Sequence, residues 1–327
     1  MKSNFSEIAP LLSLLFLLAS AAASTAVHAQ KNTATPLSHE PKKEVKKMET
    51  FGHQLRVRDS KNETKTFHLG QPRTVSREVT FYPETKSVNG FYLPRIESTT
   101  FQYKDQFVGD VQKGGSCNVD ILRYVPHGLT HIETSAHILS WDERAVTLKD
   151  IPPQNLCGLV YLMDLTHLEA KPGQSIDRRD IEARIKKITL PITMLALKTR
   201  ASLLPQDTDF SGKDYLYLHP EAAQAIHDFK PRLHCLILDL PSIDRENDGG
   251  QLLAHRYFFG LPRKAHQWVD KEKRTLVELA WFSDLKEGYY YAVITPPSFQ
   301  SNAVSTGIFF HPLIESDESV SIPKKNT

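Results

Sequence analysis

Long uninterrupted apolar runs mark the second half of the chain. Three of them are Leu156–Asp164, Leu190–Leu197 and Leu233–Asp239. A run without polar alternation suits a strand that is covered on both faces, as in the sheets of α/β proteins. The pattern therefore predicts three buried strands, and helices must supply the cover.

Two segments between or beside these runs predict such helices. Residues 176–188 carry isoleucines at spacings of four and three, with Ser175 placed as the N-cap. A second helix is predicted over Pro220–Phe229, because proline is favoured in the first turn and Pro231 ends the segment. The order strand, helix, strand from about residue 190 to 240 is typical of an α/β domain.

The region from about residue 75 to 125 has a different pattern. β-Branched and aromatic residues recur there with turn residues between them, as in Thr80–Pro83 and Thr99–Tyr103. We expect this region to be mostly strands. The chain contains no internal repeat that we can identify.

The amino-terminal residues are unlike the rest of the chain. The apolar segment Leu11–Ala23 is followed by Val27-His28-Ala29, which is a plausible cleavage site, so residues 1–29 are interpreted as a secretory signal peptide. An uncleaved anchor is the alternative. Residues 30–60 are polar and rich in lysine, which predicts a flexible linker before a domain at 61–327. We expect a periplasmic or secreted protein with no membrane contact after cleavage.

Composition narrows the choice of partners. The formal net charge is +2, so the chain lacks the strongly basic surface that a nucleic-acid-binding protein needs. A hydrophobic content of 40% is sufficient for a packed globular core. A small-molecule substrate is the expected partner.

The three cysteines are an odd number, so at least one is free or pairs between chains. Cys157 and Cys235 lie in apolar segments, where a thiol acts as a small hydrophobic group. Cys117 precedes His127 by ten residues and could approach a metal site. No Cys-x-x-Cys motif is present, and this argues against a zinc knuckle or a redox pair.

Three histidines and one carboxylate occupy odd-numbered positions of one short run: His127, His131, Glu133 and His137. In an extended chain these side chains would share a face, and β-branched residues between them favour extension. At about 3.3 Å per residue, His131 and Glu133 lie close enough to bind one ion. The outer histidines would be about 33 Å apart, so the run must bend, with Gly128 as the expected bending point, or serve two adjacent ions. The alternative is a chance cluster on an exposed strand.

The same run resembles the signature of the bacterial kynurenine formamidase and putative cyclase family. That signature reads His, any residue, Gly-Thr-His, any residue, Asp, any residue, Pro, any residue, His. Direct matches are found at His127, Thr130, His131 and His137. Leu129 replaces the glycine, Glu133 the aspartate and Ser135 the proline. Glutamate still binds metal but reaches one methylene further, and a leucine would be strained if the family's glycine has a positive φ.

Downstream segments extend the resemblance over roughly residues 115–315. Asp239–Asp244 resembles the family's segment after a buried strand, His255 its later histidine ligand and Leu276–Leu279 its late glutamate motif. We expect Asp239–Asp244 to line the pocket, because ligands bind beyond the carboxyl ends of strands. For Ser242 and Asp244, a role in forming the turn is an equal alternative.

The resemblance implies both a fold and an activity. The fold would be α/β, a β-rich single domain of the swivelling β/β/α type with helices packed on a central sheet. The activity would be hydrolysis of an amide-type bond, in an aryl formamide, a cyclic amide or a lactone, by metal-bound hydroxide. The family includes isatin hydrolase-like proteins. The resemblance to it also suggests a homo-oligomer. Kynurenine breakdown is an internal pathway, so an export signal points to a different substrate.

The candidate site residues divide into two groups. We assign His127, His131 and Glu133 to a first divalent ion, zinc or manganese. A further group would complete the ligand set of a second ion, or would transfer protons if only one ion is bound: His137, His255 and Glu278. His137 or His255 is the expected general acid, because imidazole titrates near neutrality.

Signatures of other enzyme classes are missing. The sequence has no Gly-x-Ser-x-Gly elbow, no His-Glu-x-x-His helix and no phosphate-binding glycine loop. No cofactor other than metal is expected. An exported metal- or ligand-binding protein without turnover is the alternative function, and the three departures from the signature motivate it.

Overall fold

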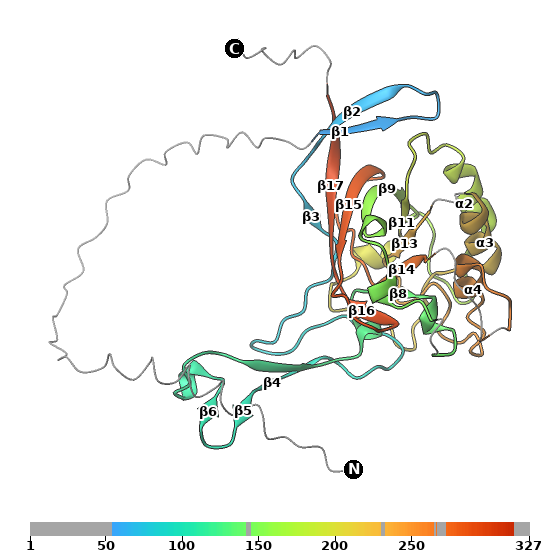
Figure 1. The fold of residues 1–327 in the computed structure, drawn as a ribbon. Helices are drawn as coiled ribbons and strands as arrows, with labels where there is room; N and C mark the ends of the chain where they lie inside the picture. The colour runs from blue at the N-terminus through green and yellow to red at the C-terminus, as the bar shows by residue number, and fades with distance from the viewer. Residues whose placement is uncertain (1–53, 142–144, 230–232, 265, 267–272, 317–327) are drawn as a thin grey trace, which may run out of the picture. The chain divides into compact units, whose positions relative to one another are not determined.

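The computed structural model describes residues 54–141, 145–229, 233–264, 266 and 273–316 (Figure 1). All of them belong to one compact unit, residues 51–327. The predicted signal peptide and most of the predicted linker lie outside the described residues. Among the described helices, none has the length and hydrophobicity needed to cross a bilayer.

A mixed sheet of eleven strands forms the centre of the described chain. Its strands are β1 (Gln54–Arg58), β2 (Thr64–Leu69), β3 (Arg73–Thr74), β8 (His131–Thr134), β9 (Cys157–Asp164), β11 (Met194–Lys198), β13 (Cys235–Leu238), β14 (Thr275–Glu278), β15 (Gly288–Thr295), β16 (Ala303–Ser305) and β17 (Gly307–Glu315). The order is β1-β2-β17-β15-β9-β11-β13-β14-β8-β16, and β3 pairs with β17. The architecture is therefore mixed α/β and dominated by the sheet, which confirms the predicted fold class.

The predicted apolar runs form the parallel centre of this sheet. Strands β9, β11, β13 and β14 pair in parallel, whereas β15 and β8 pair antiparallel on either side of them. All residues of β11 and β13 are buried, as expected for strands that are covered on both faces. The sheet thus buries two separate apolar clusters, one on each face.

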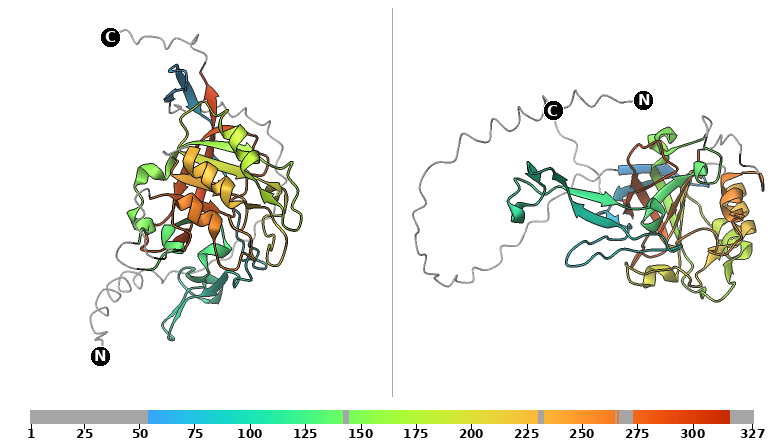
Figure 2. Two further views of the ribbon diagram at one scale, coloured as in Figure 1. Left: turned by 90° about the vertical axis from the view of Figure 1, so that its right-hand side faces the viewer. Right: turned by 90° about the horizontal axis from the view of Figure 1, so that it is seen from below.

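Three helices cover one face of the sheet, side by side in Figures 1 and 2. They are α2 (Arg178–Ile185), α3 (Pro220–Phe229) and α4 (Leu253–Phe259). The prediction for α3 is confirmed. The N-cap of α2 is Asp177 rather than Ser175, because Asp177 and Asp180 form a reciprocal capping box.

Short 3-10 helices connect many of these elements. They are η1 (Val111–Lys113), η2 (Pro126–Gly128), η3 (Ser135–His137), η4 (Leu148–Asp150), η5 (Pro153–Asn155) and η6 (Arg200–Leu203). Two of them, η2 and η3, flank strand β8 and carry candidate site residues.

The region from residue 75 to 125 contains less strand than expected. Its four strands are short and lie outside the central sheet: β4 (Glu97–Thr100), β5 (Gln102–Tyr103), β6 (Phe107–Val108) and β7 (Asp120–Arg123). Every residue of β7 is exposed, so little apolar burial supports longer strands here. A further small parallel sheet pairs β10 (Ser175–Ile176) with β12 (Tyr217–Leu218).

Strand β1 changes the predicted start of the domain. It lies within residues 30–60, the segment expected to be a linker, and pairs along its whole length with β2. Val57 in this strand belongs to the core cluster on the helix face. Residues Gln54–Arg58 are therefore packed as part of the domain.

Candidate metal centre

The run from His127 to His137 is extended only in its middle. His131 and Glu133 lie on β8, whereas His127 lies in η2 and His137 in η3. The run is therefore not one continuous strand, and it bends at η2, which contains Gly128, the expected bending point. The two 3-10 turns fold the ends of the run toward each other and place the rings of His127 and His137 4.4 Å apart.

The leucine that replaces the family's glycine fits without strain. Leu129 has φ −132° and ψ 173°, which is ordinary extended backbone. Its side chain is buried, and its carbonyl lies 2.8 Å from His131 Nδ1. Leu129 thus fixes the ring of His131, leaving Nε2 directed at the other candidate ligands.

Strand pairing brings the distant Glu278 to this run. Glu278 at the end of β14 lies opposite His131 of β8, although the two residues are far apart in sequence. Immediately after Glu278, Leu279 adopts φ 57°, a conformation that non-glycine residues rarely adopt. The Thr130 hydroxyl donates to the Leu279 carbonyl at 2.6 Å and stabilises this corner.

Helix α4 supplies the last histidine. His255 lies in the first turn of α4 and its side chain is almost fully buried. Its Nε2 lies 2.9 Å from Glu133 Oε1, and its Nδ1 lies 2.6 Å from Asp244 Oδ2. The structure therefore joins β8, β14, α4 and the loop after β13 at one place.

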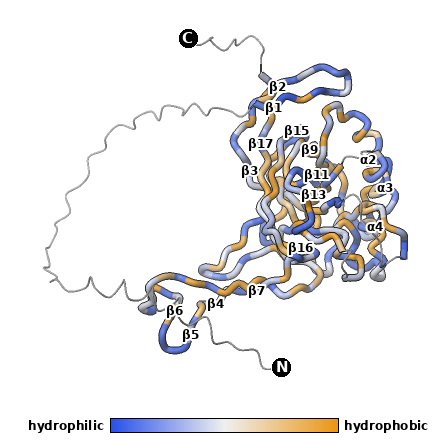
Figure 3. The backbone as a smooth tube through the Cα atoms, viewed as in Figure 1, coloured by the Kyte–Doolittle hydropathy of each residue, from blue (hydrophilic) through white to orange (hydrophobic). Residues whose placement is uncertain are grey.

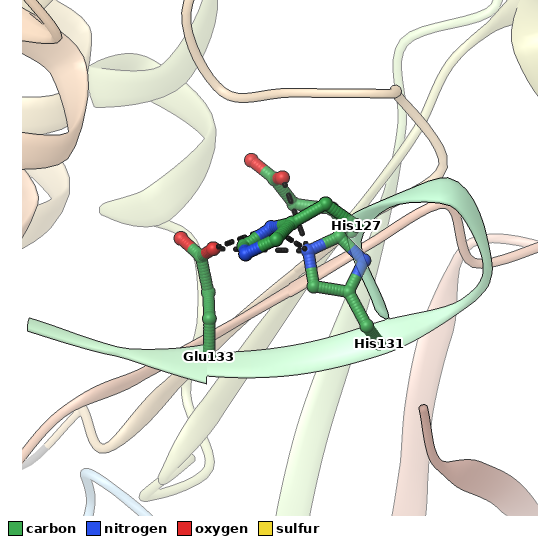
Figure 4. Close-up of side chains that lie close together, drawn as sticks. His127, His131 and Glu133 are labelled. Atoms are coloured by element: carbon green, nitrogen blue, oxygen red, sulfur yellow. Dashed lines mark hydrogen bonds and ion pairs between the residues drawn. The ribbon is translucent and has the colours of Figure 1, made fainter. Parts of the chain in front are cut away.

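The side chains converge closely around Glu133. Figure 4 shows His127, His131 and Glu133 pointing toward one another. His127 Nδ1 lies 3.0 Å from His131 Nε2 and 3.3 Å from Glu133 Oε2. His131 Nε2 lies 3.5 Å from Glu278 Oε2, and His137 Nε2 lies 4.0 Å from Glu133 Oε2. All six predicted ligands thus lie in one cluster.

The ligand atoms form two overlapping groups. The first contains His127, His131, Glu133 and Glu278, and the second contains Glu133, His137 and His255. Within each group the ligand atoms lie within 4.8 Å of one another. Glu133 belongs to both groups, so its carboxylate could contact either one ion or two.

The two buried carboxyl groups differ in pKa. Burial raises the pKa of Glu133, but the adjacent His137 and His255 outweigh it and hold the pKa well below the usual value. Burial, together with the negative charge of Glu133, raises the pKa of Glu278 to about 7. At neutral pH, Glu133 therefore carries the more firmly held negative charge.

The histidines of the cluster also differ in pKa. Burial lowers the pKa of His127 to about 3, with a smaller effect from His131, and burial likewise lowers the pKa of His137. Burial opposes protonation of His131 and His255 as well, but neighbouring carboxylates, with Glu133 foremost, raise the pKa of both. His127 and His137 are therefore neutral near pH 7, which is the form that binds metal.

The donor set fits a divalent cation. Glu133 Oε2 is enclosed and has no hydrogen-bond partner, although imidazole nitrogens face it. An unpaired buried carboxylate oxygen is costly, and a cation among neutral imidazoles would satisfy it. Imidazole and carboxylate are the usual ligands of zinc and manganese.

Three polar residues in the segment after β13 have different roles. Asp239 is fully buried and accepts hydrogen bonds from Thr199 and Ser202, so it stabilises the loop at η6 and does not line a pocket as expected. The Ser242 hydroxyl accepts from the Asp244 backbone N–H, which is a turn contact. Asp244 reaches the site through His255, and no regular spacing in the sequence identifies that pair.

The cysteines have no part in this cluster. Cys235 is buried in the core, which confirms its predicted packing role, and Cys157 is partly buried. Cys117 is exposed and belongs to neither candidate group among the described residues. The suggestion that Cys117 approaches the metal is therefore not supported.

Comparison with known protein families decides the assignment. The model of a family described as "Putative cyclase" matches residues 37–245, which is more than half of the chain. The chain belongs to the putative cyclase family. The match covers the whole run from His127 to His137 and the segment Asp239–Asp244, and it ends before His255 and Glu278. A comparison with curated proteins gave no match.

Solved structures share the fold of this chain. A "predicted metal-dependent hydrolase" from Bacillus stearothermophilus has 19% identity and a TM-score of 0.52, covering 74% of this chain and 98% of that one. Isatin hydrolase A from Labrenzia aggregata, bound to benzyl benzoate, has 14% identity and a TM-score of 0.50, with 75% and 94% covered. The isatin hydrolase A of Ralstonia solanacearum also has 14% identity and a TM-score of 0.50, covering 75% and 92%.

Proposed function

We propose that this protein is an exported metal-dependent hydrolase that opens an amide-type bond. The observation that carries the proposal is the convergence of four imidazoles and two carboxylates around an unpaired Glu133 oxygen. The structural relatives, a predicted metal-dependent hydrolase and isatin hydrolases, support the same reaction class.

A divalent ion would be held by His127, His131 and Glu133, with Glu278 beside them. A second ion would be held by the other group, which shares Glu133 and adds His137 and His255. When bound, such an ion lowers the pKa of water and polarises a carbonyl oxygen. Zinc and manganese are the metals that we propose.

When only the first ion is bound, proton transfer is assigned to His137 rather than to His255, because an imidazole that binds a metal has no lone pair left to accept a proton. Both ring nitrogens of His255 face carboxylates, Asp244 and Glu133, so this ring is held in place. The His137 side chain is 27% exposed, compared with 1% for His255, and can meet a substrate. Burial lowers the pKa of His137, so the ring is neutral and can accept a proton from water and pass it to the leaving nitrogen.

The test is hydrolysis of aryl formamides, cyclic amides and lactones by purified protein supplied with zinc or manganese. We expect turnover by the wild type and its loss in His131→Ala. As a control, Leu203→Ala changes an exposed leucine of η6 and should retain activity.

The alternative is an exported metal-binding protein without turnover. The replacement of the signature aspartate by Glu133 favours it, because glutamate reaches one methylene further than aspartate. Stoichiometric metal binding without hydrolysis of any amide, imide or lactone would establish this second function.

Export is part of the proposal and restricts the substrate to compounds found outside the cytoplasm. The apolar segment Leu11–Ala23 and the sequence Val27-His28-Ala29 support secretion to the periplasm or beyond. An extracytoplasmic amide or lactone is therefore the proposed substrate class. Fractionation of cells that produce the full chain, followed by amino-terminal sequencing, tests for a mature protein that begins at Gln30.

We also propose that the protein is a homo-oligomer. The segment 97–123, which we call the arm, forms two small sheets outside the central sheet (Figure 3). Ile121 and Leu122 of β7 are each 50% exposed and, as neighbours on a strand, face opposite sides of the ribbon. A two-stranded ribbon is marginally stable alone, so contact with a second copy would stabilise the arm.

A further inference from the structure

Asp244 makes three contacts with the start of helix α4. Its Oδ1 accepts the Ala254 backbone N–H at 2.8 Å, and its Oδ2 accepts the His255 backbone N–H at 3.1 Å. The same Oδ2 lies 2.6 Å from His255 Nδ1. One carboxylate thus holds both the backbone and the ring of His255.

These contacts determine which nitrogen of His255 faces the metal centre. An ionised carboxylate only accepts hydrogen bonds, so the nitrogen beside Asp244 must carry a hydrogen. In the neutral ring the other nitrogen, Nε2, then has a free lone pair, and it faces Glu133 at 2.9 Å. Only a nitrogen with a lone pair can bind a cation.

We propose that Asp244 is a positioning residue that keeps the Nε2 lone pair of His255 directed at the metal centre. This inference rests on the proposed metal site but concerns a residue outside the predicted ligand set. It also explains why an aspartate stands at this position. A serine or an asparagine could cap the helix equally well. Neither of them, however, has two oxygens that act only as hydrogen-bond acceptors.

The test compares Asp244→Asn with the wild type in zinc affinity, measured by competition with a chromophoric chelator. An asparagine has one acceptor oxygen, so it can serve either Ala254 N–H or the His255 ring, but not both. We expect the zinc affinity to fall about 10- to 100-fold, as is common when a residue that orients a metal-binding histidine is lost. Thermal unfolding of the metal-free variant monitors the helix cap separately.

A matched control is Asp248→Asn. Asp248 lies in the same loop and accepts backbone N–H groups of Gly250 and Leu252, but it does not contact His255. Its variant should bind zinc as the wild type does. Equal zinc affinity in Asp244→Asn and the wild type would overturn the inference, whereas a wild type that binds no zinc would overturn the proposed metal site instead.

A second measurement covers the case in which Asp244→Asn does not fold. In zinc-loaded wild-type protein with ¹⁵N-labelled histidine, the His255 ring should show a hydrogen-bonded Nδ1–H and no proton on Nε2. A proton on Nε2 would contradict the proposed role of Asp244 directly.

Discussion

Glu133 is the residue at which the two candidate ligand groups meet. Its two oxygens face different partners, since Oε1 contacts His255 and Oε2 faces His127. The side chain is fully buried, so its length fixes where the negative charge lies. The departure from the signature aspartate therefore bears directly on the geometry of the site.

Glu133→Asp, which restores the signature residue, should weaken metal binding in this protein. Shortening the side chain withdraws the carboxylate from both His255 and His127, whose positions are set by other elements. We expect an affinity loss of about 10-fold or more, by analogy with changes next to metal ligands. Isothermal titration calorimetry with zinc measures the affinity. Tighter binding by the variant would show that the surrounding residues adapt to aspartate.

Glu278 should make the metal-free protein less stable as the pH rises. Its pKa is raised from 4.5 to about 7, so between these values the folded state binds more protons than the unfolded state. The free energy of unfolding contributed by this group then falls with increasing pH, by about 3 kcal/mol in total.

Urea unfolding of wild-type protein and Glu278→Gln, in the presence of a chelator at pH 5 and pH 8, tests this expectation. Glutamine cannot ionise, so the variant should gain stability relative to the wild type at pH 8 but not at pH 5. An identical difference at the two pH values would contradict the raised pKa.

At the scale of elements, the site depends on how β8 meets the end of β14. Thr130 lies at this junction and is buried. Its hydroxyl donates to the Leu279 carbonyl at 2.6 Å and accepts the Arg77 backbone N–H at 2.9 Å. The contact thus links the strand that carries His131 to the corner that carries Glu278.

Thr130→Val should destabilise this junction, because it leaves a carbonyl and an N–H buried without a partner. We expect a loss of about 1–3 kcal/mol in the free energy of unfolding, together with weaker metal binding. Denaturant titration measures the first quantity. Thr130→Ser keeps the hydroxyl and serves as the control, and a valine variant as stable as the serine variant would rule out the hydroxyl link.

At the scale of the whole molecule, the arm is the feature that the catalytic proposal leaves unexplained. Ile121→Glu combined with Leu122→Glu should shift an oligomer toward monomer, because a charged group cannot be buried between copies without a partner. Light scattering coupled to size-exclusion chromatography measures the mass. Leu203→Glu, at an exposed leucine outside the arm, should leave the mass unchanged; a monomeric wild type would contradict the proposal.

The sequence by itself determined the local features of this protein. Continuous apolar runs gave the buried strands β9, β11 and β13, and proline with an amphipathic pattern gave α3, because these signals lie within single elements. The ligand types were equally visible, since the run from His127 to His137 and the family resemblance of His255 and Glu278 are properties of the chain.

Tertiary structure decided how those ligands meet. The ends of the His127–His137 run are brought together by two 3-10 turns, and Glu278 arrives through antiparallel pairing of β14 with β8. Asp244 gains its role only because α4 packs where its carboxylate can hold His255. Contacts between elements far apart in sequence depend on packing, and no local pattern of residues encodes them.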